Sequence, residues 1–123
     1  MSDSCPFCAR QTLELLAEND LAFAIRDKFP VRPLHTLVIP KRHFSDVFSA
    51  TTEELAALHV LADECRAAIV QGDSSAQGFN FGSNIGAAAG QKIFHAHLHL
   101  IPRRVDEPPP PAAQPDSTPT DGS

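Results

Sequence analysis

The chain has no tryptophan, no tyrosine and one methionine among its 123 residues, so phenylalanine supplies every aromatic ring. It also lacks any apolar run near the roughly 20 residues that cross a bilayer, and its first residues lack the basic start and apolar stretch of a signal peptide. We therefore expect a cytoplasmic protein that has no membrane as a partner. Hydrophobic residues make up 42% of the chain, which predicts one folded domain around a single core.

Cysteine is scarce as well. Three cysteines cannot all pair within one chain, and Cys5 and Cys8 are separated by only two residues, which suits a reducing compartment better than a disulfide framework. The likelier use of this pair is a metal site. Cys65 lies on the apolar face of a predicted helix and is interpreted as a packed core thiol.

Basic residues are few and unevenly placed. The net charge of −5 comes mostly from residues 105–123, which hold four acidic residues and no lysine or arginine. Residues 1–104 are close to neutral, with 10 basic and 11 acidic residues, so no basic face for nucleic acid is expected. Arg103 and Arg104 are interpreted as solvated charges.

The carboxyl-terminal residues have little with which to build a core. No large apolar residue follows Val105, and the prolines at 108–111 are consecutive. Such a stretch cannot offset the entropy lost on folding. We predict a folded domain at residues 1–104, followed by a disordered, proline-rich acidic tail at residues 105–123.

Apolar patterning within the domain predicts one long helix and five strands. The helix begins after Thr51, whose spacing to Glu54 is that of a capping box, and apolar residues recur at helical spacing up to Gly72. The predicted strands are residues 13–16, 21–25, 35–40, 78–84 and 93–101. Hairpin-type connections favour an α+β fold around an antiparallel sheet.

Three histidines, His95, His97 and His99, alternate along the last of these strands. In a strand they would line one face at steps of about 3.3 Å per residue, whereas a helix would scatter them. Stability explains them poorly, because every buried ring nitrogen needs a partner. The spacing leaves three interpretations open: a solvated sheet face, a zinc site with an open position for water, and a catalytic cluster.

Four segments of the chain resemble the histidine triad (HIT) family in their order and content. They are Cys5-Pro-Phe-Cys8, His35-Thr-Leu-Val-Ile-Pro-Lys-Arg-His43, Asn84-Ile-Gly86, and Gly90-Gln-Lys-Ile-Phe-His-Ala-His-Leu-His-Leu-Ile-Pro-Arg103. The resemblance implies a HIT-like fold, with a five-stranded antiparallel sheet, one long helix and a short second helix. It also implies a homodimer that joins two such sheets.

HIT proteins act at the α-phosphate of a nucleotide through a covalent nucleotidyl-histidine. By this resemblance His97 would be the nucleophile, and a neutral imidazole is nucleophilic near pH 7. His99 would contact the phosphoryl oxygens or assist the leaving group, and His35 would orient the triad. The implied substrate is a dinucleoside polyphosphate or a related nucleotide conjugate.

The resemblance also assigns substrate contacts. Asn84 and Gln91 match positions that contact phosphate or the bridging oxygen. Lys92 stands where many relatives have Ser or Thr, so a hydroxyl contact is replaced by a cation. Lys92, and a proline tail in place of the relatives' glycine-rich segment, support one alternative, a nucleotide-binding adaptor with little turnover.

A zinc site is the last implication of the resemblance. In relatives that have the cysteine pair, two histidines complete the ligand set, and here these are His43 and His95. Together with Cys5 and Cys8 they would leave no open coordination position, so this Zn²⁺ would be structural and the chemistry would require no metal. A zinc-dependent hydrolase that uses the histidine triad as its ligands stays the other alternative.

Overall fold

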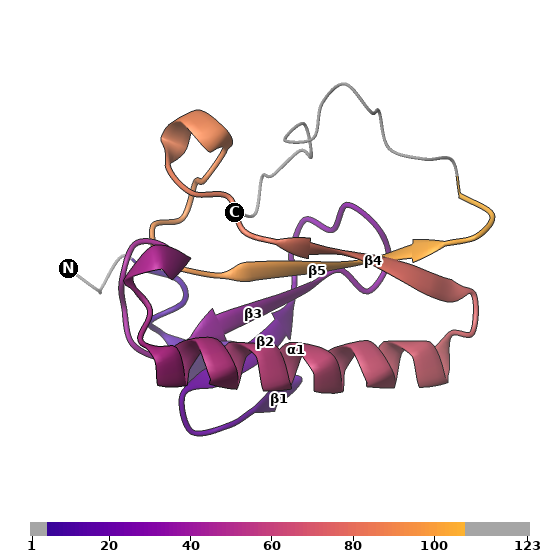
Figure 1. The fold of residues 1–123 in the computed structure, drawn as a ribbon, viewed down its shortest axis with the longest axis horizontal. Helices are drawn as coiled ribbons and strands as arrows, with labels where there is room; N and C mark the ends of the chain where they lie inside the picture. Colours follow the sequence, from indigo (N-terminus) through magenta and orange to yellow (C-terminus); the bar gives the residue numbers. More distant parts are fainter. Residues whose placement is uncertain (1–4, 108–123) are drawn as a thin grey trace.

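In the computed structural model, which describes residues 5–107, one long helix covers one face of a five-stranded antiparallel sheet (Figure 1). The elements are β1 (Ala17–Glu18), β2 (Ala22–Arg26), β3 (Thr36–Pro40), α1 (Thr52–Gly72), β4 (Ala76–Gly82) and β5 (Leu98–Arg104), with 3-10 turns η2 (Arg10–Thr12), η3 (Val47–Ser49) and η4 (Ala87–Ala89). The strand order is β1-β2-β3-β5-β4. The predicted α+β fold is confirmed, and the additional helical segments in residues 5–107 are these short 3-10 turns.

Helix α1 begins where the capping box predicts. Thr51 accepts a hydrogen bond from the Glu54 N–H, and the Thr51 N–H donates to the Glu54 carboxylate at 2.8 Å. The Arg42 guanidinium forms two 2.8 Å hydrogen bonds with the same carboxylate. These hydrogen bonds lower the pKa of Glu54 to about 2, and those from Arg42 have the largest effect. No helix of residues 5–107 has the length and apolarity needed to cross a membrane.

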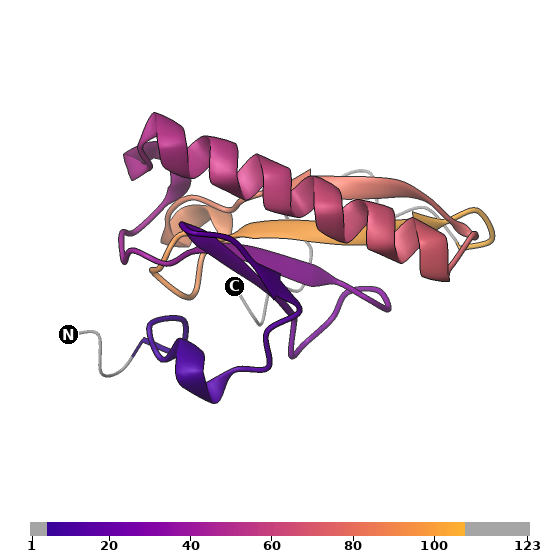
Figure 2. The ribbon, with the colours of Figure 1, turned by 90° about the horizontal axis from the view of Figure 1, so that it is seen from below.

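Successive residues of β2 and β3 point to opposite faces of the sheet and enter two different cores. The core beneath α1 contains Ala22, Ala24, Val38, Leu58, Leu61, Ala62, Cys65, Ile69, Ala76 and Leu100, which confirms the predicted burial of Cys65. The core on the other face contains Phe7, Phe23, Ile25, Leu37 and Ile39. Figure 2 shows the amino-terminal segment on the side of the sheet opposite α1. Both faces of the central strands are therefore covered by protein.

The predicted strand at 13–16 is wrong, because the hairpin in this region is formed by β1 and β2. Leu13 and Leu15 pack against the second core, and the ladder with β2 begins at Ala17. The Asn19 side chain accepts hydrogen bonds from two backbone N–H groups of the turn. The apolar run at 13–16 thus covers a face of the sheet instead of extending it.

The predicted strand at 93–101 is shifted, since β5 begins at Leu98. Before that residue the chain leaves β3 and follows the loop after it, where the Ala96 N–H donates to the Phe44 carbonyl at 2.7 Å. His95 and His97 therefore lie in an extended segment outside the sheet ladder, and only His99 lies within β5.

Residues at the end of β5 fold back on the sheet. Arg103 and Arg104 form ion pairs with Glu107 and Asp73, at 2.6 and 3.0 Å, with side chains 17% and 15% exposed. Their interpretation as solvated charges is wrong, because both side chains are largely buried and each pairs with a carboxylate. Residues 108–123 of the predicted tail lie outside the described residues.

Candidate active site and metal centre

A cluster of buried histidines occupies the face of the sheet opposite α1. His35, His95, His97 and His99 are each at most 8% exposed. The His97 ring lies 5.2 Å from the His99 ring and 5.3 Å from the Phe7 ring, centroid to centroid. The structure thus brings the predicted triad together with His35, which comes from β3 and its preceding loop.

One hydrogen bond determines the protonation of the middle histidine. Nδ1 of His97 lies 2.7 Å from the backbone carbonyl oxygen of His95. A carbonyl oxygen only accepts, so Nδ1 carries the hydrogen and Nε2 of the neutral ring holds a lone pair. His97 therefore has the tautomer that a nucleophile attacking through Nε2 requires.

A second chain of hydrogen bonds determines the protonation of His99. The Val31 N–H donates to Nδ1 of His35 at 3.1 Å, so His35 carries its hydrogen on Nε2. That Nε2 lies 2.9 Å from Nδ1 of His99 and donates to it. His99 must then carry its hydrogen on Nε2, which is buried and has no hydrogen-bond partner among residues 5–107. A buried donor of this kind is available for a bound oxygen.

Burial keeps these rings neutral. It lowers the pKa of His97 and of His35 below the ordinary value, and Asp27 opposes the shift in both. Burial, with His97 and His35 nearby, lowers the pKa of His99 to about 3. The site therefore presents one nitrogen lone pair and one N–H donor, and no positive charge of its own.

Asp27 is a site residue that the sequence analysis missed. Its side chain is buried, with Oδ2 3.4 Å from Nε2 of His35 and Oδ1 accepting from the Phe29 N–H. Asp27 directly follows β2, which is buried at four of its five positions. A charged residue at the end of such an apolar strand was the signal that the sequence offered. Its contact with the Nε2–H of His35 supports the same tautomer.

The four predicted metal ligands converge at one edge of this cluster. Nδ1 of His95 lies 3.4 Å from Sγ of Cys5, 3.6 Å from Sγ of Cys8 and 3.1 Å from Nδ1 of His43. Sγ of Cys8 lies 3.2 Å from Nδ1 of His43. Atoms bound to one tetrahedral zinc ion are about 3.3 to 3.8 Å apart. The ligand set is therefore compatible with Zn²⁺ in both chemistry and spacing.

The protonation of His95 also suits a cation. Nε2 of His95 donates to the Pro40 carbonyl at 2.7 Å, which leaves the Nδ1 lone pair facing the cysteines. Burial, together with Cys5, raises the pKa of the Cys8 thiol. Metal binding would have to displace that thiol proton, because the thiolate is the ligand form.

The geometry does not favour the triad as a shared set of metal ligands. Within residues 5–107, each group of side chains able to hold a metal contains one triad histidine: His95 in the cysteine group, and His99 in a group with Asp27 and His35. In the second group the Val31 N–H occupies Nδ1 of His35 and keeps a hydrogen on Nε2, the atom that would face the metal. This group forms a hydrogen-bonded chain instead.

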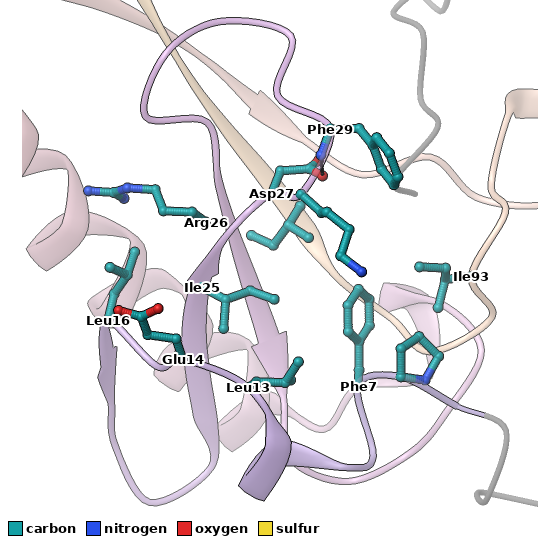
Figure 3. A pocket seen from close by; sticks show the side chains of 12 residues that line it. Phe7, Leu13, Glu14, Leu16, Ile25, Arg26, Asp27, Phe29 and Ile93 are labelled. Atoms are coloured by element: carbon teal, nitrogen blue, oxygen red, sulfur yellow. Dashed lines mark hydrogen bonds between the residues drawn. The ribbon is translucent and has the colours of Figure 1, made fainter.

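A cavity of about 420 Å³ is connected to the histidines through two of its lining residues, Phe7, which contacts His97, and Asp27, which contacts His35 (Figure 3). Its walls are mostly apolar, and Phe7, whose ring also contacts His97, stands between Ile25 on one side and Ile93 on the other. Asp27 lies at one end of the cavity. Volume and lining are typical of a site for a small organic molecule.

The loop between β4 and β5 carries the remaining predicted contacts. Ser83 donates to the His97 carbonyl at 2.7 Å, which brings the adjacent, half-buried Asn84 to this edge of the site. The carboxamide of Gln91 accepts from the Gly86 N–H and donates to two backbone carbonyls, so it is engaged in holding the loop. Lys92 is exposed.

Comparisons with known proteins agree over most of the chain. The HIT domain family matches residues 10–106. A HIT-like protein of Mycoplasma genitalium is 42% identical over 106 residues, which cover 83% of this chain and 74% of that protein. The bis(5′-adenosyl)-triphosphatase of Dictyostelium discoideum is 35% identical, over 80% of this chain and 65% of that protein. An adenylylsulfatase of Arabidopsis thaliana is 35% identical over 85% of this chain, which spans about half, 54%, of that protein.

Solved structures share the fold. A zinc-bound histidine triad family protein of Mycobacterium smegmatis has a TM-score of 0.78 and 34% identity, over 87% of this chain and 80% of that one. A histidine triad nucleotide-binding protein of Sulfolobus tokodaii has a TM-score of 0.77 and 38% identity, over 85% and 72%. With the family match and the histidine arrangement, these similarities show that the chain belongs to the HIT domain family.

Proposed function

We propose that this protein hydrolyses or transfers a nucleotidyl group at the α-phosphate of a dinucleoside polyphosphate or nucleotide conjugate, through a covalent adduct on His97. The observation that carries the proposal is the 2.7 Å hydrogen bond from His97 Nδ1 to the His95 carbonyl, which leaves the Nε2 lone pair as a neutral nucleophile. The names of the Dictyostelium and Arabidopsis relatives support cleavage of a nucleotide as the reaction class.

In the first step, Nε2 of His97 attacks the α-phosphorus, and the bond to the leaving oxygen breaks with its electron pair. The positive charge that forms on the ring is stabilised by the His95 carbonyl. The Nε2–H of His99 donates a hydrogen bond to the phosphoryl or departing oxygen. The departing oxygen takes its proton from water. Water then attacks the same phosphorus, the nitrogen–phosphorus electrons return to His97, and the nucleoside monophosphate leaves.

The cavity that Phe7 lines supports a nucleoside as the bound group. A purine or pyrimidine ring would lie against Phe7 and the aliphatic side chains of Ile25 and Ile93. We propose Asn84 and Lys92 as phosphate contacts, and Gln91 as the residue that holds their loop through its backbone hydrogen bonds.

We also propose that Cys5, Cys8, His43 and His95 hold a structural Zn²⁺. Bound zinc would cross-link the amino-terminal segment to the segment before β5 and would have no open position for substrate. The likeness to the zinc-bound protein of Mycobacterium smegmatis supports this. The metal would thus act on His97 only by holding its neighbour His95.

We also propose a homodimer in which the sheets of two copies join. Strand β4 is at the edge of the sheet, and its Phe81 is 47% exposed. An exposed edge strand can pair with that of a second copy. Sedimentation analysis should give a dimer that Phe81→Asp weakens; a monomer at all concentrations would refute this part of the proposal.

The decisive experiment is to trap the adduct. The protein is incubated with diadenosine tetraphosphate, diadenosine triphosphate, adenylyl sulfate or adenosine phosphoramidate, with and without a chelator, and then analysed by intact-mass and peptide-mass spectrometry. We expect an added adenylyl group on the peptide that contains His97, and loss of turnover by at least about 10³-fold in His97→Ala.

Other outcomes separate the alternatives. Binding of these nucleotides without turnover would favour an adaptor. Chemistry that stops on chelation while the fold persists would favour a zinc-dependent hydrolase. Turnover by His97→Ala at the unaltered rate would refute the proposal.

A further inference from the structure

We propose that Glu107, three residues beyond β5, is a positioning residue for the reaction, acting through Arg32 to hold the hydrogen-bonded pair of His35 and His99. The inference rests on the proposed function for its effect on turnover. It has a structural consequence, the protonation pattern of two histidines, that does not depend on any substrate.

Glu107 joins the loop before β3 to the end of β5. One carboxylate oxygen lies 2.8 Å from Nε of Arg32 and 2.6 Å from Nε of Arg103, and the other accepts from the Arg104 N–H at 2.6 Å. The Glu107 side chain is 14% exposed and that of Arg103 17%. Charge-assisted hydrogen bonds at partly buried groups are stronger than surface ion pairs. The carboxylate therefore ties the loop before β3 to the end of β5.

Arg32 carries this connection into the loop that serves His35. Its Nη1 donates to the Val31 carbonyl at 3.0 Å, and its own carbonyl accepts from the His35 N–H at 3.1 Å. The Val31 N–H donates to Nδ1 of the same histidine. Arg32 and Val31 thus hold the backbone N–H and the ring of His35, while its carbonyl accepts from the Asp27 N–H at 2.9 Å.

The loop needs such support because its backbone is strained. Leu34 has φ of 70°, the left-handed region that leucine rarely adopts. A residue in this conformation is strained and persists only where surrounding contacts hold it. Arg32 connects this loop to another part of the molecule through its ion pair with Glu107.

Loosening the loop would change the proton positions in the site. Without the Val31 N–H on Nδ1, Asp27 and His99 still accept at Nε2 of His35, but a fraction of molecules would carry the hydrogen on Nδ1. The form with hydrogen on Nδ1 cannot donate to His99, so His99 would no longer be held with its hydrogen on Nε2. The donor proposed to face the phosphoryl oxygen would be lost in that fraction of molecules.

The test compares Glu107→Ala with Asp106→Ala, the exposed neighbouring carboxylate, in the full chain. Arg32→Ala removes the loop side of the contact and leaves the bonds of Glu107 to β5. We expect kcat to fall about 10- to 100-fold in Glu107→Ala and Arg32→Ala, with KM changed less than 3-fold, because positioning of a reacting group is lost. Glu107→Gln keeps an acceptor and should recover part of kcat.

The second readout is ¹⁵N nuclear magnetic resonance of the histidine rings without substrate. We expect the hydrogen on Nε2 of both His35 and His99 in the unsubstituted protein and in Asp106→Ala, and mixed tautomers in the other two alanine variants. Unchanged tautomers in Glu107→Ala would overturn the inference, as would an equal loss of kcat in Asp106→Ala. If His97→Ala retains turnover, the proposed function fails while the tautomer result still decides the role of Glu107.

Discussion

Nε2 of His35 donates to Nδ1 of His99 across 2.9 Å, so one buried imidazole decides which nitrogen of the other carries hydrogen. His35 directly precedes β3, and His99 lies in β5, the strand that pairs with β3. The two residues are 64 positions apart in the chain. In the proposed reaction, His35 would therefore act through His99, without contact between His35 and phosphate.

Replacing His35 should therefore impair turnover more than binding. In His35→Ala the Nδ1 of His99 loses its donor, and we expect kcat to fall about 10²-fold with a smaller change in KM. Steady-state kinetics with the substrate that yields the adduct would measure this. His59→Ala is the matched control, since His59 is exposed on α1; equal kinetics for both variants would contradict the assignment.

His99 should remain neutral over the physiological range. Burial and the neighbouring histidines lower its pKa to about 3, whereas the unfolded chain has an ordinary value of about 6.5. Because the folded form then binds fewer protons, His99 contributes stability above pH 6.5 that is lost as the pH falls toward 3. A ring resonance of His99 that titrates near pH 6.5 in the folded protein would rule this out.

Removing the metal ligands should destabilise the protein. Cys8→Ser, or prolonged chelation, is expected to lower Tm by about 10 °C or more, because the proposed structural metal would tie two distant segments together. Metal content measured by mass spectrometry should be about one Zn²⁺ per chain before chelation. Equal Tm and equal zinc content in Cys8→Ser and the unsubstituted protein would show that these residues do not form a metal centre.

Phe7 should determine nucleotide affinity. Its ring contacts His97 and lines the cavity, so Phe7→Ala is expected to raise KM about 10-fold. The KM of Phe7→Leu should lie between those of the unsubstituted protein and Phe7→Ala. Phe48→Ala provides the control, because Phe48 is 84% exposed. The prediction fails if the two alanine variants have the same KM.

Glu54 should give the stability of the fold a specific acid dependence. Its pKa of about 2 lies below the ordinary 4.5, so its contribution is complete above pH 4.5 and is lost between pH 4.5 and 2. Glu54→Gln is expected to lower the unfolding free energy at pH 7 by about 1 to 2 kcal/mol. It should also reduce the loss of stability between pH 4.5 and 2. Denaturant titration against Glu53→Gln, the exposed neighbour, tests both expectations.

Local and periodic features of this protein could be predicted from its sequence. The capping box at Thr51 and the spacing of apolar residues through α1 depend on neighbours within one or two helical turns. The turn at Asn19 and the strand ending at Pro40 are local in the same sense. The residue types at the cysteine pair and the histidine triad, read against a family pattern, predicted both the metal ligands and the fold.

The limits of strands could not be predicted in the same way. Residues 13–16 and the segment of His95 and His97 have strand-like composition, yet each lies outside the ladder. The first packs on the second core, and the second follows the Phe44 backbone. Composition describes which face a residue prefers, whereas a ladder depends on which other strand lies alongside.

The sequence alone thus determined which reactive side chains are present, namely three histidines and two cysteines, and where the capped helix begins. Only the tertiary structure decided which nitrogen carries a hydrogen, because the Val31 N–H, the His95 carbonyl and the Pro40 carbonyl reach their rings through the folding of the chain. The contacts of Asp27 with His35 and of Glu107 with Arg32 are likewise set by the folding of the chain. Hydrogen bonds act over about 3 Å, and a sequence does not state which groups lie within that distance.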